Sequence, residues 1–161
     1  MLATFHCNLC STQNILPESG FARDESSCTS CHSSVRMRGM LYALSMNLFG
    51  TPLSLPDFPA LKSIRGLGMS DDEQYAAQLS SKFDNRNTNF ERASFLDVVH
   101  PVEGQIGEYV FILCDDVVEH VAPPDRGRTS QHFLTPPHQL APQISGAAAL
   151  GTTRRWPPTS G

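Results

Sequence analysis

The chain has 161 residues and a mass of 17.7 kDa, which allows one ordinary domain, or a small metal module and part of another. Apolar residues make up 40% of the chain, and the formal net charge of −4 gives no general electrostatic case for nucleic-acid binding. The charge is uneven: residues 1–121 carry 8 basic and 15 acidic side chains, and residues 122–161 carry 4 and 1.

The sequence contains no sign of a membrane segment or of an export signal. No run approaches the ~20 apolar residues that cross a bilayer. The first six residues lack the basic start and apolar centre of a signal peptide. We therefore expect a soluble cytoplasmic protein in a reducing compartment, with no membrane partner and no nucleic-acid partner.

Two Cys-x-x-Cys pairs, Cys7 with Cys10 and Cys28 with Cys31, lie near the amino terminus with seventeen residues between them. Thiolates three positions apart on a tight turn can face one ion, and two such turns complete a closed tetrahedral zinc site. The intervening loop is polar and too poor in apolar residues to fold by itself. The pattern predicts a structural Zn²⁺ held by four cysteines in a ribbon-like module over residues 1–34.

Other uses of these cysteines stay open. Two disulfides would need an oxidising compartment, and a redox motif would more naturally be a single pair. The run from Cys28 to His32 also matches the c-type haem attachment pattern, which would leave Cys7 and Cys10 without a role. His6 or His32 would be a substitute metal ligand, although both are more simply flanking residues.

A helix and a linker are expected over residues 35–60. Apolar residues at helical spacing predict a helix over 34–48, with Ser33 or Ser34 as its N-cap and Gly50 as its terminator. Three prolines between residues 51 and 60 then predict an extended linker rather than a helix or a central strand.

A strand, a glycine turn and a helix are predicted directly after the linker. The turn contains Gly66 and Gly68, and the helix would be capped by Ser70 or Asp71 and continue to Phe83. In nucleotide-binding α/β proteins, such glycines let the backbone approach a ligand at the start of the helix. The third glycine of the dinucleotide-binding motif is missing.

Further strands are predicted toward the end of the folded part. Residues 86–100 suggest one or two short strands, and 95–99 is the better candidate. The apolar run within 107–114 is typical of a parallel strand buried on both faces. Polar residues follow it, at the edge where open α/β sheets bind ligands. Residues 124–161 are rich in proline and lack periodicity, which predicts a disordered tail.

The order of these segments resembles class I S-adenosylmethionine-dependent methyltransferases, in particular bacterial members with an N-terminal cysteine-paired zinc ribbon. The resemblance rests on the two cysteine pairs, on the segments 64–71 and 95–98, and on 111–121, which looks like the family's fourth-strand motif. It covers about residues 5–124. It implies an α/β fold in which the four-cysteine zinc ribbon is followed by an incomplete Rossmann-like methyltransferase sheet over 61–123.

The same resemblance implies S-adenosylmethionine as the cofactor and methyl transfer to an unknown acceptor. Gly66 and Gly68 match the loop under the methionyl part of the cofactor, and Asp97 matches a position near the adenine. Asp116 follows the fourth strand, where cofactor and acceptor meet. Glu91 matches, loosely, the acidic residue that binds the ribose hydroxyls.

The chain departs from the family pattern after its fourth strand, because the remaining helix, the Pro-Gly-Gly turn and three strands do not follow. We therefore expect a truncated or frame-shifted product whose authentic sequence ends near Pro124, with methyl transfer impaired or lost. The alternative is a zinc-ribbon binding or interaction module without catalysis.

Overall fold

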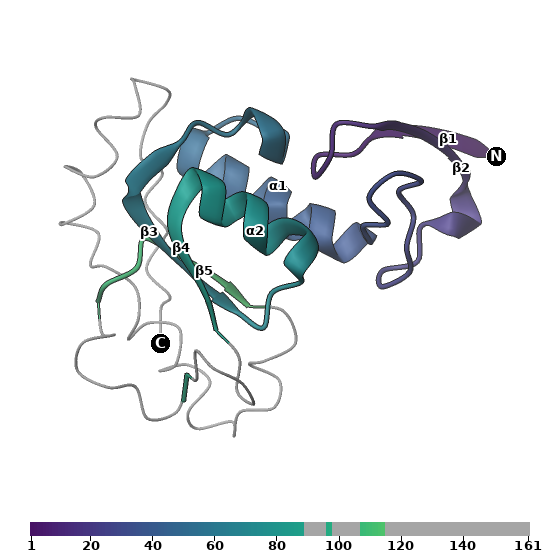
Figure 1. Cartoon of the computed structure of the whole chain (residues 1–161). Coiled ribbons are helices and arrows are strands. Elements are labelled where there is room, and N and C mark those ends of the chain that lie inside the picture. Colours follow the sequence, from purple (N-terminus) through teal and green to yellow (C-terminus); the bar gives the residue numbers. More distant parts are fainter. Residues whose placement is uncertain (89–95, 98–106, 115–161) are drawn as a thin grey trace, which may run out of the picture.

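The computed structural model describes residues 1–88, 96–97 and 107–114, which form a mixed α/β fold with two small sheets. Figure 1 labels the helices and the strands of the sheets and marks the amino terminus. They are β1 (Leu2–His6), β2 (Gln13–Pro17), η1 (Glu18–Gly20), α1 (Val35–Phe49), η2 (Leu55–Asp57), β3 (Leu61–Met69), α2 (Glu73–Lys82), β4 (Phe83–Thr88) and β5 (Phe111–Cys114).

Strands β1 and β2 form an antiparallel hairpin. The turn of the hairpin carries the first cysteine pair, and the backbone N–H of Cys7 donates to the carbonyl of Thr12 at 2.9 Å. A hairpin of this length is marginally stable in water by itself. The first 34 residues therefore need additional contacts, which the cysteine cluster and α1 provide.

Helix α1 confirms the sequence prediction at both ends. The Ser34 hydroxyl accepts a hydrogen bond from the backbone N–H of Met37 at 3.3 Å. Gly50 has φ of 69°, a left-handed conformation that glycine adopts without steric cost, and its N–H donates to the carbonyl of Met46 at 3.0 Å. The linker that follows is extended, apart from the short 3₁₀ helix η2.

The two glycines lie inside β3 rather than in a turn after it, which corrects the sequence prediction. β3 continues to Met69, and neighbouring elements cover its glycines. A Cβ atom on Gly66 would overlap the ring of Phe111, and one on Gly68 would overlap the carboxylate of Asp71. Side chains therefore pack directly against the backbone of this strand, and the glycine spacing has a structural reason of its own.

Helix α2 begins later than the sequence predicts. Its N-cap is Asp72, whose carboxylate accepts a hydrogen bond from the N–H of Gln74 at 2.8 Å. Ser70 has φ of 61° and turns the chain out of β3, while Asp71 is buried. The predicted caps, Ser70 and Asp71, are therefore wrong because the chain uses both to leave the strand.

Strand β4 follows α2 without a loop and begins before the region 86–100 in which short strands are expected. Its residues are mostly polar, and only Phe83 and Thr88 are buried. A strand is recognised in a sequence by apolar side chains at alternate positions, which β4 lacks. Pairing with β3 along its length makes it a strand.

The second sheet has the order β4-β3-β5, and both pairs of strands are parallel. Strand β3 is central, and both of its faces are covered: Ile64 packs with α1 and α2, whereas Leu67 and Met69 pack with Leu96 and Tyr109. Burial on both faces is typical of parallel sheets. The predicted apolar strand over 107–114 is confirmed for Phe111–Cys114.

Several predictions fall wholly or partly outside the described residues. Leu96 and Asp97 have no regular secondary structure, and the rest of the strand expected over 95–99 is not described. Glu91, Asp116 and the tail from residue 124 also lie outside the described residues. In the part that is described, no helix combines the length and apolar character needed to cross a membrane.

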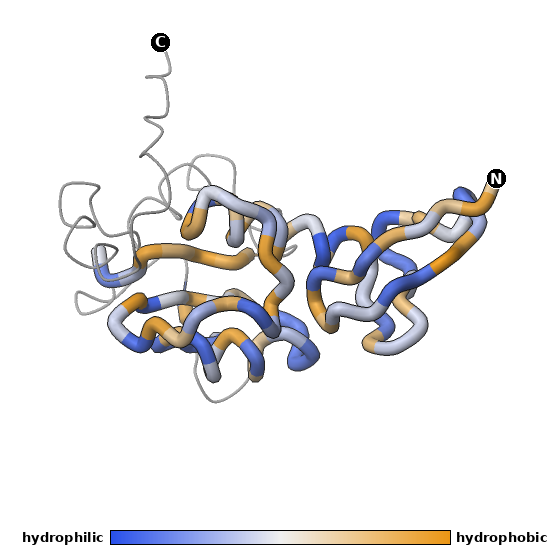
Figure 2. Tube along the Cα trace, turned by 90° about the horizontal axis from the view of Figure 1, so that it is seen from above, coloured by the Kyte–Doolittle hydropathy of each residue, from blue (hydrophilic) through white to orange (hydrophobic). Residues whose placement is uncertain are grey.

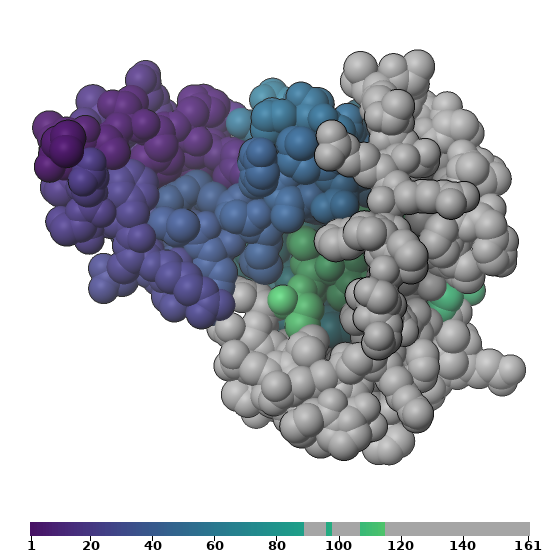
Figure 3. Space-filling view, turned by 180° about the vertical axis from the view of Figure 1, so that it is seen from behind, coloured from purple at the N-terminus to yellow at the C-terminus, as the bar shows by residue number. Residues whose placement is uncertain are grey.

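One hydrophobic core runs from the cysteines to the sheet. It includes Cys7, Leu9 and Cys28 at one end and Phe111 and Leu113 at the other, with the buried face of α1 between them. Seen from above, the cysteine loops and the sheet form two lobes joined by α1 and the linker (Figure 2). The space-filling view shows no break in packing between the purple and blue segments (Figure 3).

A row of four aromatic rings joins α1, the linker and the sheet. Phe58 lies 5.1 Å from Phe49 and 6.2 Å from Phe83, between ring centroids, and Phe83 lies 5.3 Å from Phe111. All three pairs are edge-to-face, the arrangement that aromatic rings favour. The linker thus contributes Phe58 as the residue that fixes the helix against the sheet.

We expect Phe58→Ala to destabilise the protein by about 3–5 kcal/mol, because it removes a ring that is 2% exposed and leaves a cavity. Urea unfolding of the metal-loaded protein measures the change. Tyr42→Ala is the matched control: Tyr42 is 52% exposed, so its loss should change stability by no more than about 0.5 kcal/mol. Equal effects of the two variants would contradict this description of the core.

Candidate metal centre

The four cysteines of the two pairs come together in space. Their sulfur atoms all lie within 4.8 Å of one another, with 3.7 Å between Cys7 and Cys31 and 3.6 Å between Cys10 and Cys28. Four sulfurs at about 2.3 Å from one tetrahedral zinc lie about 3.8 Å apart. Disulfide sulfurs lie about 2.05 Å apart, and all four cysteines are free thiols. The distances fit a shared metal ion and exclude the two disulfides.

The two cysteine pairs have the same backbone geometry. The residue after each pair is left-handed, with φ of 62° at Ser11 and 57° at His32. In each turn this residue donates its N–H to the carbonyl of the first cysteine, at 2.8 Å for Cys7 and 3.0 Å for Cys28. Repetition of one turn places two sulfurs from each side toward a common point.

The histidines are not part of the sulfur cluster. His6 and His32 are both exposed, and the group of clustered metal-binding side chains in the described residues consists of cysteines alone. His32 contributes its backbone conformation, which non-glycine residues adopt only at some cost. The cluster therefore offers four sulfur atoms that could bind a metal, the composition typical of structural zinc sites.

Buried Asn14 connects the hairpin to the second cysteine turn. Its side-chain nitrogen lies 3.6 Å from the sulfur of Cys28 and donates to the carbonyl of Thr12 at 2.9 Å. Its oxygen accepts two hydrogen bonds from Thr29, from the backbone N–H and from the hydroxyl, both at 2.9 Å. Such outer contacts orient metal ligands and are a large part of the design of metal sites.

The surroundings of Cys28 and Cys31 shift the pKa values of their thiols in opposite directions. Burial opposes ionisation of Cys28, but hydrogen bonds from the backbone of Cys31 and Ser30 lower its pKa to about 6. Burial, together with contacts to Cys10 and Cys28, raises the pKa of Cys31 to about 12. Binding of a metal at neutral pH must therefore remove at least the proton of the Cys31 thiol.

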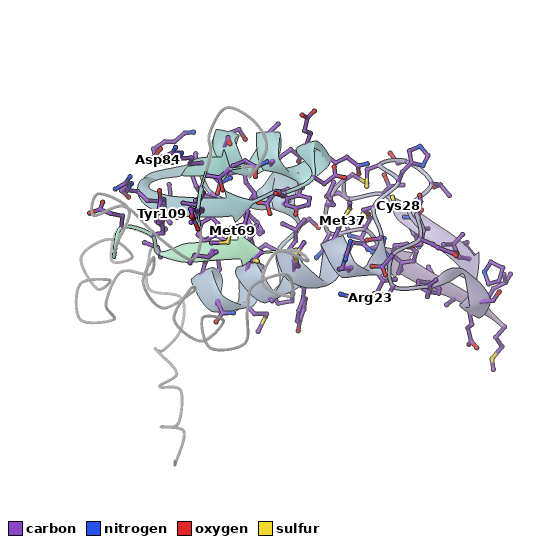
Figure 4. All side chains as sticks on the ribbon, turned by 90° about the horizontal axis from the view of Figure 1, so that it is seen from below. Arg23, Cys28, Met37, Met69, Asp84 and Tyr109 are labelled. Carbon is purple, nitrogen blue, oxygen red and sulfur yellow. The ribbon has the colours of Figure 1, made fainter. Side chains whose placement is uncertain are left out.

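Figure 4 shows the two ends of the described structure. Cys28 and Met37 lie at one end, where the cysteine loops meet the start of α1. Met69, Tyr109 and Asp84 lie at the other end, with the sheet. Of the residues with a predicted cofactor role, Gly66, Gly68 and Asp97 are described, whereas Glu91 and Asp116 lie outside the described residues. Gly66 and Gly68 lie on one face of β3, and Asp97 is half-buried.

A polar cluster not anticipated as a site lies where β3 and β4 end. Asp71 accepts a hydrogen bond from the hydroxyl of Tyr75 at 3.2 Å, and its backbone exchanges two bonds with the Asn87 side chain at 3.0 and 2.9 Å. The hydroxyl of Thr88 donates to the carbonyl of Gly68 at 2.8 Å. Asp71 is the second residue after the end of β3, and its place in the sequence predicts only a helix cap.

No family model, curated protein or solved structure matches the chain.

We expect the purified protein to bind one zinc ion, and Cys10→Ser or Cys28→Ser to abolish tight binding, because each change removes one of four ligands. Metal content by atomic absorption and the thermal unfolding midpoint are the measurements. Cys114→Ser is the control, since Cys114 lies on β5 outside the cluster. Zinc retained by both ligand variants would show that the four sulfurs do not form the site.

Zinc affinity should weaken as the pH falls. Near neutrality the logarithm of the association constant should change by at least about one per pH unit, because the Cys31 thiol must lose its proton. Below pH about 6 the decline should steepen, since the Cys28 thiolate becomes protonated as well. Competition with a chromophoric chelator across a pH series measures the slope, and a flat profile would contradict thiolate ligation.

Proposed function

We propose that the chain holds a structural Zn²⁺ through Cys7, Cys10, Cys28 and Cys31. The observation that carries the proposal is the cluster of four unbridged sulfurs within 4.8 Å of one another, two of whose separations, 3.6 and 3.7 Å, are close to the edge of a zinc tetrahedron. Four cysteines fill every position of such a tetrahedron, so the ion would stabilise the fold rather than activate a substrate. A reducing compartment such as the cytoplasm would keep the thiols available.

We propose further that the sheet is part of a class I S-adenosylmethionine-dependent methyltransferase domain. The support is the strand order. By the family resemblance, β3 corresponds to the first strand, and β5 carries the fourth-strand motif. In Rossmann-type sheets, with strand order 3-2-1-4-5-6, the first strand lies between the second and the fourth, all parallel. The order β4-β3-β5 with two parallel pairs agrees with that arrangement.

The carboxyl end of this sheet would hold the cofactor. S-adenosylmethionine supplies an activated methyl group, and the protein has to bind and orient it. Polar groups suited to ribose hydroxyls or to an ammonium group lie there on Asp71 and Asn87, and Asp97 is half-buried. The lack of a side chain at Gly68 lets Asp71 and Asn87 lie close to the backbone of β3. The methyl acceptor is not specified by any of these groups.

Isothermal titration of the zinc-loaded protein with S-adenosylhomocysteine tests the cofactor proposal. We expect micromolar binding that Asp97→Ala weakens at least about tenfold, a loss of about 1.4 kcal/mol. Asp57→Ala, an exposed carboxylate of the linker, is the matched control. Gly68→Val is unsuitable, since its side chain would collide with Asp71 whether or not a cofactor binds. Absence of heat from a protein that holds zinc would contradict the methyltransferase assignment.

The second candidate function is a zinc-ribbon interaction module without catalysis. A groove of about 520 Å³ between the hairpin, α1 and the linker favours it. The lining is mainly apolar, with Phe5, Phe21 and Tyr42, and it includes the guanidinium of Arg38 but no carboxylate. Charge complementarity favours a peptide with an acidic side chain beside apolar ones. The S-adenosylhomocysteine titration separates this candidate from the first.

A further inference from the structure

The guanidinium of Arg38, on the first turns of α1, binds the loop that carries the second cysteine pair. One terminal nitrogen donates to the carbonyl of Ser33 at 2.7 Å and lies 3.2 Å from the Ser33 hydroxyl, and the other donates to the hydroxyl of Ser27 at 2.7 Å. Among the described residues, no carboxylate forms an ion pair with Arg38. Its donors are directed to uncharged oxygens next to the metal centre instead.

Ser33 connects this arginine to two of the sulfurs. Its side chain is fully buried, and its hydroxyl oxygen lies 3.4 Å from the sulfur of Cys7 and 3.3 Å from that of Cys31. Since this oxygen accepts from Arg38, its own hydrogen remains available for a sulfur. When metal binding removes the thiol protons, the hydroxyl becomes the only possible donor in these contacts.

The position of Arg38 is fixed from three directions. Its guanidinium lies over the ring of Phe5, 4.5 Å from the centroid, and its backbone carbonyl accepts a hydrogen bond from the side chain of Asn8 at 2.9 Å. Asn8 lies between the two cysteines of the first pair. The arginine thus contacts the hairpin, the first cysteine turn and the loop before α1, and its charge cannot move far from the sulfurs.

The position of Arg38 matters because the zinc-loaded site would carry a net negative charge. Four thiolates around one Zn²⁺ are formally doubly negative, and hydrogen bonds to thiolates reduce the charge that the buried site must accommodate. A guanidinium stays protonated at any relevant pH. The Ser33 hydroxyl connects this positive charge to the sulfurs of Cys7 and Cys31.

We propose that Arg38 is a positioning residue of the metal centre: through Ser33 it directs a hydroxyl hydrogen toward the sulfurs of Cys7 and Cys31 and offsets the charge of the loaded site. The inference rests on the proposed zinc site. It also makes the packing of α1 part of metal binding, because the helix carries the arginine.

Titration of the full-length protein with Co²⁺, whose absorption reports thiolate coordination, tests the proposal. Arg38→Met should weaken Co²⁺ binding about 10–100-fold, the usual effect of losing an outer-shell partner. Arg38→Lys keeps the charge but not the planar fork, and should lose less. Arg65→Met is the control, since Arg65 lies over the Tyr109 ring of the sheet, 5.3 Å from its centroid.

A double-mutant cycle separates a relay from a general effect on folding. Ser33→Ala alone should also weaken Co²⁺ binding, and the loss in the double variant should be smaller than the sum of the two single losses, because both changes break the same connection. At saturating Co²⁺, both single variants should shift the sulfur-to-metal charge-transfer band to lower energy, which a loss of stability alone would not do.

Additive losses, an unshifted band or unchanged affinity in Arg38→Met would overturn the proposal. If the unmodified protein does not bind Co²⁺ at all, the metal site itself is wrong, so failure of this inference and failure of the proposed zinc site give different results.

Discussion

Four thiols lie within 4.8 Å of one another without forming a disulfide. The rest of the amino-terminal structure depends on the interaction that holds these four sulfurs together. The first 34 residues contain a short hairpin and polar loops, which bury little apolar surface. Sulfurs at 3.6 and 3.7 Å are too far apart for covalent bonds and suitably spaced for a shared ion. A metal ion would supply the stabilisation that side-chain packing does not, as in other small metal-binding modules.

The cysteine centre is continuous with the sheet. The same core includes Cys28, Leu41 on α1 and Phe111 on β5, and Phe58 connects the helix to the sheet through its ring contacts. The backbone N–H of Leu55 in the linker also donates to the carbonyl of Asn8 in the first cysteine turn, at 2.6 Å. Loss of a bound metal would therefore destabilise the protein beyond the cysteine loops, because Cys7 and Cys28 also belong to the core.

Local signals were sufficient for some elements and insufficient for others. The cysteine spacing, the Ser34 cap and the Gly50 terminator are chemical requirements that short sequence segments express directly. The structure brings the four cysteines together and confirms the cap and the terminator. The caps of α2 and the location of the glycines were wrong, because pairing of β3 with two neighbours extends the strand through Gly66 and Gly68. Strand β4 shows the same limit: its polar residues become a strand only through the partner beside them. The outer contacts of Ser33 and Arg38 depend on tertiary packing and have no sequence signature.

We propose, in short, that one metal ion is bound by four sulfurs and stabilises residues 1–34. X-ray absorption at the zinc edge of the purified protein tests it most directly, because the spectrum reports both the identity and the distance of the ligands. Our account predicts a single shell of four sulfurs at about 2.3 Å. A shell containing nitrogen or oxygen, or a protein that folds to the same stability with no bound metal, would contradict it.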